Sequence, residues 1–75
     1  MIYSNIFQAQ PTVYLSLEEF PTITEAFGED TQSISGDIVE EELAATKVGD
    51  LTTIEKQLLD FLQDGGREYL FVFEY

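Results

Sequence analysis

The chain has 75 residues, and its fifteen Asp and Glu side chains against three Lys and Arg give it a net charge of -12 at neutral pH. Neither Cys nor His is present, which excludes a disulfide framework, a Cys-based zinc site and a Ser-His or Cys-His catalytic couple. Hydrophobic residues make up 44% of the sequence and include four Tyr and six Phe. This composition excludes the disordered class and predicts a single compact acidic domain over residues 1–75.

The chain is predicted to open with two extended segments, Ile2–Ala9 and Thr12–Leu15. They are separated at Gln10-Pro11, where proline opposes a helix and favours an extended or turning backbone. We therefore expect a hairpin or a bend between two short strands.

A helix ending near Phe27 follows, and its start has two candidates. Ser16 and Thr22 each begin a segment with the spacing of a capping box, and Pro21 is well tolerated if the helix begins at the proline itself. Gly28 is expected to end the helix with a left-handed backbone conformation. With either start, one helical face carries the apolar residues Leu17, Phe20, Ile23 and Phe27.

The middle of the chain is predicted to hold a short strand at Gln32–Ser35 and then a helix at 38–45. Asp37 and Glu40 have the spacing of a capping box at the start of that helix. The helix prediction is the weaker one, because Glu42 lies within the apolar arc of the helical wheel and strand alternation fits no better.

The clearest helix runs from Asp50 to Asp64, with Asp50 or a neighbouring Thr as its cap and Gly65-Gly66 at its end. Its apolar stripe consists of Leu51, Ile54, Leu58, Phe61 and Leu62.

The last segment, Arg67–Tyr75, alternates aromatic residues with Leu70 and Val72, so it is apolar on both faces. Such a strand belongs in the middle of a sheet. The predicted fold is α+β: a mostly antiparallel sheet of three or four strands with two or three helices packed on it.

Enzyme function is not expected, since serines such as Ser33 and Ser35 have no base to activate them. We also expect no cofactor and no dedicated metal site. An EF-hand alignment that begins at Asp30 matches only at its two ends, Asp30 and Glu41, and places Ser35 where Gly is required.

The N-terminal residues lack the basic and apolar regions of a signal peptide, and the longest apolar run, Tyr69–Phe73, is too short to span a bilayer. The expected location is therefore the cytoplasm, without membrane contact.

Carboxylates are concentrated in the N-terminal half, before the first basic residue, Lys47. A helix over residues 17–29 would place Glu18, Glu25 and Glu29 in one narrow stripe. In the C-terminal half, Lys56 is expected to pair with Asp60 one turn away. The candidate partner-binding residues are Glu18, Glu25, Glu29, Asp30, Asp37, Glu40, Glu41 and Glu42.

A one-signed field of this strength repels nucleic acid and attracts basic surfaces. An array of carboxylates on a rigid scaffold resembles the phosphates of nucleic acid, which proteins bind mainly with Lys and Arg. We therefore expect no direct binding of nucleic acid. The expected partner is a basic protein surface, such as a nucleic-acid-binding protein or a nuclease complex.

In size, charge and the Glu18–Glu42 distribution, the chain resembles the small acidic inhibitors that phages encode against host nucleases, restriction enzymes and CRISPR effectors. It also resembles the immunity proteins that block nuclease toxins. The resemblance implies a non-catalytic inhibitor of the nucleic-acid-mimic type, an anti-CRISPR or anti-restriction protein of the host cytoplasm, and no functional residue is transferred from it. Tyr3 and Tyr14 are candidate aromatic anchors.

Two alternatives stay open. The first is an immunity protein against a nuclease toxin. The second is a small regulatory or adaptor subunit whose charge only keeps it soluble. Such a subunit would bind its partner through an apolar edge of the Tyr69–Tyr75 strand, or pair with itself as a homodimer.

Overall fold

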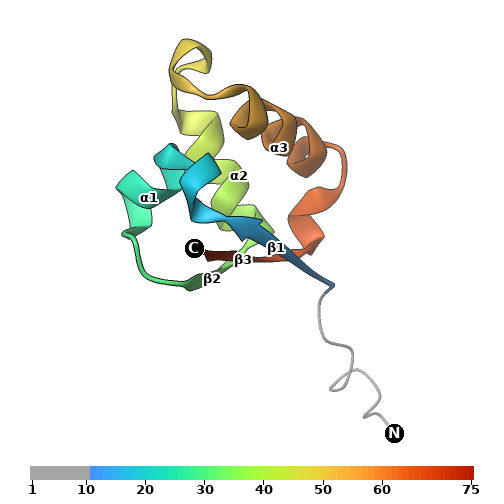
Figure 1. Ribbon diagram of the computed structural model, residues 1–75. Coiled ribbons are helices and arrows are strands. Elements are labelled where there is room, and N and C mark those ends of the chain that lie inside the picture. Colours follow the sequence, from blue (N-terminus) through green and yellow to red (C-terminus); the bar gives the residue numbers. More distant parts are fainter. Residues whose placement is uncertain (1–10) are drawn as a thin grey trace, which may run out of the picture.

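The computed structural model describes residues 11–75 (Figure 1). The predicted strand at Ile2–Ala9, its turn and the candidate anchor Tyr3 lie outside the described residues. The remaining elements follow the predicted order closely. Their bounds are β1 (Thr12–Ser16), η2 (Leu17–Glu19), α1 (Pro21–Phe27), β2 (Gln32–Ser35), α2 (Gly36–Ala45), η3 (Val48–Asp50), α3 (Thr53–Gln63), η4 (Gly66–Glu68) and β3 (Leu70–Glu74).

The sheet of the described chain has three strands in the order β1-β3-β2. The C-terminal strand is central, as predicted from its two apolar faces. The predicted α+β class is confirmed, and of the three or four strands predicted, residues 11–75 form three. The prediction of a mostly antiparallel sheet is wrong, because β1 runs parallel to β3 and only β2 is antiparallel to it. Side-chain alternation is the same in both directions, so the pattern in the sequence carried no information on strand direction.

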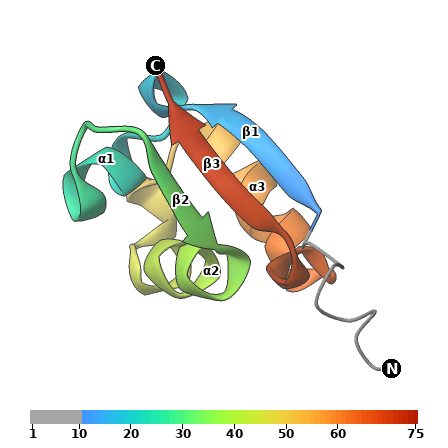
Figure 2. The same ribbon diagram turned by 90° about the horizontal axis from the view of Figure 1, so that it is seen from below.

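Helices α2 and α3 cover one face of the sheet, which Figure 2 shows from the opposite side. Phe71 and Phe73 of the central strand point into this layer and are fully buried. The ring of Phe20 meets Phe73 edge to face, with 5.5 Å between the ring centroids. The other buried apolar residues of the core are Leu17, Ile23, Ile34, Val39, Leu43, Leu51, Leu58 and Leu62.

The two candidate starts of the first helix both have a structural counterpart. Residues Leu17–Glu19 form a 3-10 turn after Ser16, and the α-helix begins at Pro21. Neither Ser16 nor Phe20, which precede the two helical segments, makes a side-chain cap. Proline in the first turn interrupts the segment because it cannot donate the backbone hydrogen bond of a continuous helix. The helix ends at Phe27, as predicted, and Gly28 follows with a positive φ of 96°. Its ψ of 178° lies outside the left-handed helical region that was expected.

The middle helix is confirmed and begins at Gly36. The capping box expected from Asp37 and Glu40 is not formed, because Ser35 occupies the cap position and makes no side-chain hydrogen bond. Gly36 is buried against η4: a Cβ atom here would lie 2.6 Å from the carbonyl oxygen of Arg67. This close approach requires glycine and joins the start of α2 to the turn before β3.

The long helix is confirmed, with Thr52 as its cap and Gly65, at a φ of 101°, just beyond its end. The predicted apolar stripe is only partly correct. Ile54 and Phe61 are 38% and 42% exposed, whereas Glu55 is completely buried. The buried face of α3 is therefore rotated relative to the predicted one, toward the neighbouring helix α1.

Candidate partner-binding surface

A buried carboxylate holds the two N-terminal ends of α1 and α3 together. Glu55 Oε1 accepts a hydrogen bond of 2.9 Å from the backbone N–H of Thr52, and Glu55 Oε2 accepts one of 2.7 Å from the N–H of Thr22. The hydroxyl of Thr52 accepts in turn from the N–H of Glu55, which completes a capping box. The start of α1 lacks a side-chain cap of its own, so α3 supplies the missing acceptor. This contact positions helix α1, which carries Glu25, relative to α3.

All eight predicted partner-binding residues lie at the surface. Six of them are exposed, while Glu40 and Glu42 are half-buried on α2. They come from η2, α1, the loop before β2, and α2. None of the eight is part of the buried core, which a role in binding a partner requires.

The predicted stripe of Glu18, Glu25 and Glu29 along one helix is not formed. Glu18 lies in η2, Glu25 in α1 and Glu29 beyond the glycine that ends α1. Pro21 and Gly28 separate the three residues into different backbone segments, so regular helical spacing does not apply to them.

The structure instead brings carboxylates together across a groove between α1, α2 and η3. Glu25, Glu42 and Asp50 line this groove, which has a volume of about 420 Å³. The remaining lining residues, Pro21, Thr22, Ala26 and Thr46, carry no charge. We call this hollow the acidic groove. Asp50 was missed as a site residue, because its position before a predicted helix pointed to a capping role.

A second acidic position lies where β3 ends. The hydroxyl of Tyr75 donates a hydrogen bond of 3.5 Å to Glu29 Oε1. Partial removal from water, followed by the negative charge of Glu29 and a smaller contribution from Glu18, raises the pKa of Tyr75. Glu18 and Glu29 thus act on the same phenol, although they are not on one helix.

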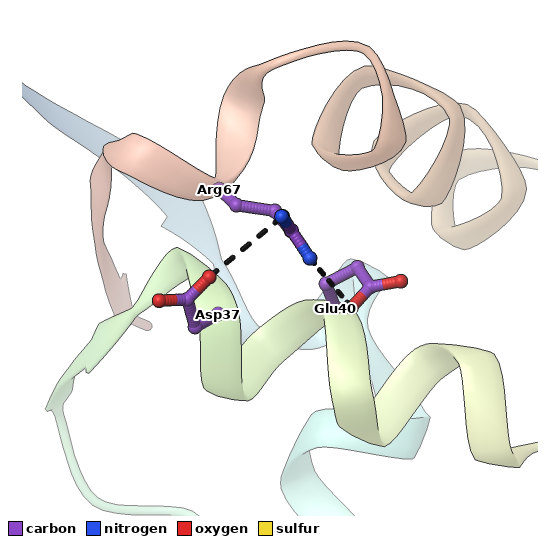
Figure 3. Close-up of polar contacts among 3 residues, drawn as sticks. All are labelled: Asp37, Glu40 and Arg67. Atoms are coloured by element: carbon purple, nitrogen blue, oxygen red, sulfur yellow. Dashed lines mark ion pairs between the residues drawn. The ribbon is translucent and has the colours of Figure 1, made fainter.

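A third group is partly neutralised by a cation. Figure 3 shows Arg67 of η4 directed toward two carboxylates of α2, with its Nε 3.7 Å from Asp37 Oδ1 and its Nη1 4.0 Å from Glu40 Oε1. Such long and largely exposed ion pairs contribute little stability, about 0–1 kcal/mol. Their effect on the surface is larger, since one positive charge offsets the field of two predicted site residues. For the other six candidates, no ion pair is found within residues 11–75.

The C-terminal half differs from the prediction in two ways. No ion pair joins Lys56 and Asp60 in the described chain, although both line a shallow apolar groove beside Val48 and Leu59. Strand β3 is bonded on both sides, by β1 and β2. The adaptor alternative therefore lacks its proposed strand edge at Tyr69–Tyr75. Tyr14, a candidate anchor, is 66% exposed on β1.

Metal and membrane features were searched over residues 11–75. No group of three or more Asp and Glu side chains in this part of the chain is arranged to hold a metal ion. None of its helices is long and apolar enough to cross a membrane. No protein-family model, curated protein or solved structure matches the chain.

Proposed function

We propose that the protein is a non-catalytic inhibitor that binds a basic, nucleic-acid-binding cleft of a nuclease or defence complex and blocks access of the nucleic acid. It would act in the host cytoplasm, as an anti-CRISPR or anti-restriction protein does. The observation that carries the proposal is the acidic groove, which is lined by carboxylates from three separate elements and by no basic residue.

The groove supports the proposal because its carboxylates are held on a folded scaffold and carry negative charge. Three carboxylates on a folded scaffold form an anionic surface without the cost of ordering a flexible acidic tail. A Lys or Arg side chain that enters the groove would meet them as it meets consecutive phosphates. The remaining net charge adds long-range attraction, which speeds association with a basic cleft and weakens as salt is added.

Competition with nucleic acid is the property that tests the proposal. The protein is immobilised and exposed to a nuclease-treated bacterial lysate, and bound proteins are then eluted with a short DNA duplex or with sodium chloride at equal ionic strength. We expect the duplex to displace the captured protein more completely than the salt. Equal displacement would argue against a shared cleft.

Charge-reversal variants localise the interaction. The pair Glu25→Lys and Glu42→Lys is expected to weaken capture by about tenfold or more, because attraction in the groove becomes repulsion. Asp60→Lys with Asp64→Lys is the matched control, since it changes the net charge equally, on α3 and at its C-terminal cap. If both double variants lose capture to the same extent, overall charge rather than the groove is responsible and the proposal is wrong.

The identity of the captured protein separates the inhibitor from the immunity protein. Both use the same surface chemistry, but an immunity protein would capture a nuclease toxin rather than a defence complex.

A further inference from the structure

The shallow groove beside Val48 and Leu59 lies next to the acidic groove, at the turn that joins α2 to α3 (Figure 1). We call it the apolar groove. It has a volume of about 430 Å³, and its walls include Leu51, Leu59 and Val48. One lysine, Lys56, and one aspartate, Asp60, also line it, so its charges balance. The acidic groove, by contrast, is lined by three carboxylates and no basic residue.

The two grooves share a wall. Thr46 lines both of them, and its hydroxyl donates a hydrogen bond of 3.2 Å to the backbone carbonyl of Glu42 in the last turn of α2. Asp50 lines the acidic groove, and the next residue, Leu51, lines the apolar groove. The Cα atoms of successive residues are only about 3.8 Å apart. Two neighbouring side chains of one partner can therefore reach both grooves.

The turn between the grooves is held by hydrogen bonds of its own. The N–H of Asp50 donates to the carbonyl of Lys47 over 2.8 Å, and the N–H of Leu51 donates to the carbonyl of Val48 over 3.2 Å. Leu51 is 6% exposed and belongs to the core, whereas Val48 is 65% exposed. The turn thus presents a stiff apolar side chain to the solvent from a hydrogen-bonded backbone, so ordering this side chain on binding costs little entropy.

We propose that the apolar groove is the second half of the partner interface. It takes an apolar side chain of the same basic protein, next to the Lys or Arg that enters the acidic groove, and in this it rests on the proposed function. Protein interfaces commonly combine an apolar anchor with a polar or charged rim, and the adjoining grooves offer both. A second copy of this chain is the less favourable occupant, because two chains of charge -12 repel each other.

Two short peptides of equal charge test the inference on the full chain. The Arg-Trp peptide is acetyl-Gly-Arg-Trp-Gly-amide, and the Arg-Gly peptide, acetyl-Gly-Arg-Gly-Gly-amide, lacks the apolar side chain. In nitrogen-15 NMR titrations, we expect the Arg-Trp peptide to bind about fivefold more tightly or better, since it removes additional apolar surface from water. It should shift the amide signals of both Glu25 and Leu59, whereas the Arg-Gly peptide should shift that of Glu25 alone.

The outcomes separate this inference from the proposed function. Equal affinity of the two peptides would overturn the inference and leave the acidic groove as the binding site. No shift at Glu25 with either peptide would count against the acidic groove itself, and the inference would fall with it. If acetyl-Gly-Gly-Trp-Gly-amide binds as tightly as the Arg-Trp peptide, the apolar groove is independent of the basic partner. A signal of Leu59 that moves on dilution of the protein alone would show a second copy in the groove. Either result would refute the inference.

Neighbouring alanines of α2 provide a matched pair of variants. Ala44 and Ala45 are both exposed, but Ala44 lines the apolar groove and Ala45 lines neither groove. Ala44→Gln places a longer, polar side chain in the groove, so it should reduce the affinity of the Arg-Trp peptide to that of the Arg-Gly peptide. Ala45→Gln should leave the affinity unchanged. Equal effects of the two substitutions would contradict binding in the apolar groove.

A second pair of variants tests the exposed apolar side chain of the turn. Val48→Ser should also remove the advantage of the Arg-Trp peptide, because it takes away apolar surface from the groove wall. Ile38→Ser, at a 47% exposed position of α2, should preserve that advantage. If Val48→Ser preserves it as well, the apolar groove does not hold the tryptophan and the inference is wrong.

Discussion

Replacing Glu55 should be among the most damaging changes at any charged residue described here. Glu55→Ala removes two hydrogen bonds from backbone N–H groups to a carboxylate and leaves the N–H of Thr22 without an acceptor. Each bond of this type contributes about 1.5–3 kcal/mol, so we expect the loss of both to lower the free energy of unfolding by about 3–6 kcal/mol. Glu55→Gln keeps one oxygen acceptor but turns an N–H₂ group toward a second donor, and we expect a loss of about 2–3 kcal/mol. A domain of this size has a total stability of only about 4–11 kcal/mol.

Urea unfolding followed by circular dichroism measures these losses, with Glu41→Gln as the control. Glu41 is exposed on α2, and its substitution removes the same charge, so relief of repulsion between carboxylates is the same in both variants. The control should stay within about 0.5 kcal/mol of the parent protein. Hydrogen exchange at Thr22 should become faster only in the Glu55 variants. If Glu55→Gln unfolds at the same urea concentration as Glu41→Gln, the bridging role assigned to this carboxylate is refuted.

Three further outcomes follow from the packing and the electrostatics. Gly36→Ala should lower the free energy of unfolding by about 1–3 kcal/mol, because its Cβ would overlap the backbone of η4. Gly49→Ala, where the same atom meets nothing within 4 Å, should change it by about 0.5 kcal/mol or less in the same urea assay. Phe73→Ala should lower the free energy of unfolding by about 3–5 kcal/mol in thermal or urea unfolding, because removal of a fully buried ring leaves a cavity beside the central strand. If the free energy fell by no more than it does when an exposed residue is replaced, the core position of Phe73 would be contradicted. Glu29→Gln should lower the pKa of Tyr75 toward its ordinary value, since it removes a negative charge that favours the neutral phenol; an unchanged NMR titration of the Tyr75 ring would show that Glu29 has no influence on it.

The acidic site was only partly predictable. Composition showed that carboxylates would dominate the surface, and the structure places all eight candidates there. Their grouping depends on contacts between distant segments: Asp50 joins Glu25 and Glu42 across the acidic groove, while Arg67 approaches Asp37 and Glu40. Neither association follows from spacing, because the residues belong to different elements.

The burial of Glu55 has a similar origin. In the sequence it is one more acidic residue of a charged helix, and its spacing from Thr52 indicates only a local cap. The second acceptor position on its carboxylate is used by α1, a helix whose own sequence offers no cap. Packing of the two helices is needed to exclude water from this carboxylate.

The positions of the helices and strands in the described chain were determined by local chemistry that is visible in the sequence. Proline cannot donate a backbone hydrogen bond, glycine accepts a positive φ, and apolar periodicity distinguishes helix from strand. Tertiary structure alone decided that β1 runs parallel to β3, that α3 buries Glu55 rather than Ile54, and that the acidic groove forms. These features depend on which segments pack against each other. The alternation and spacing of apolar residues within one segment are the same whichever neighbour it packs against, so they cannot predict that neighbour.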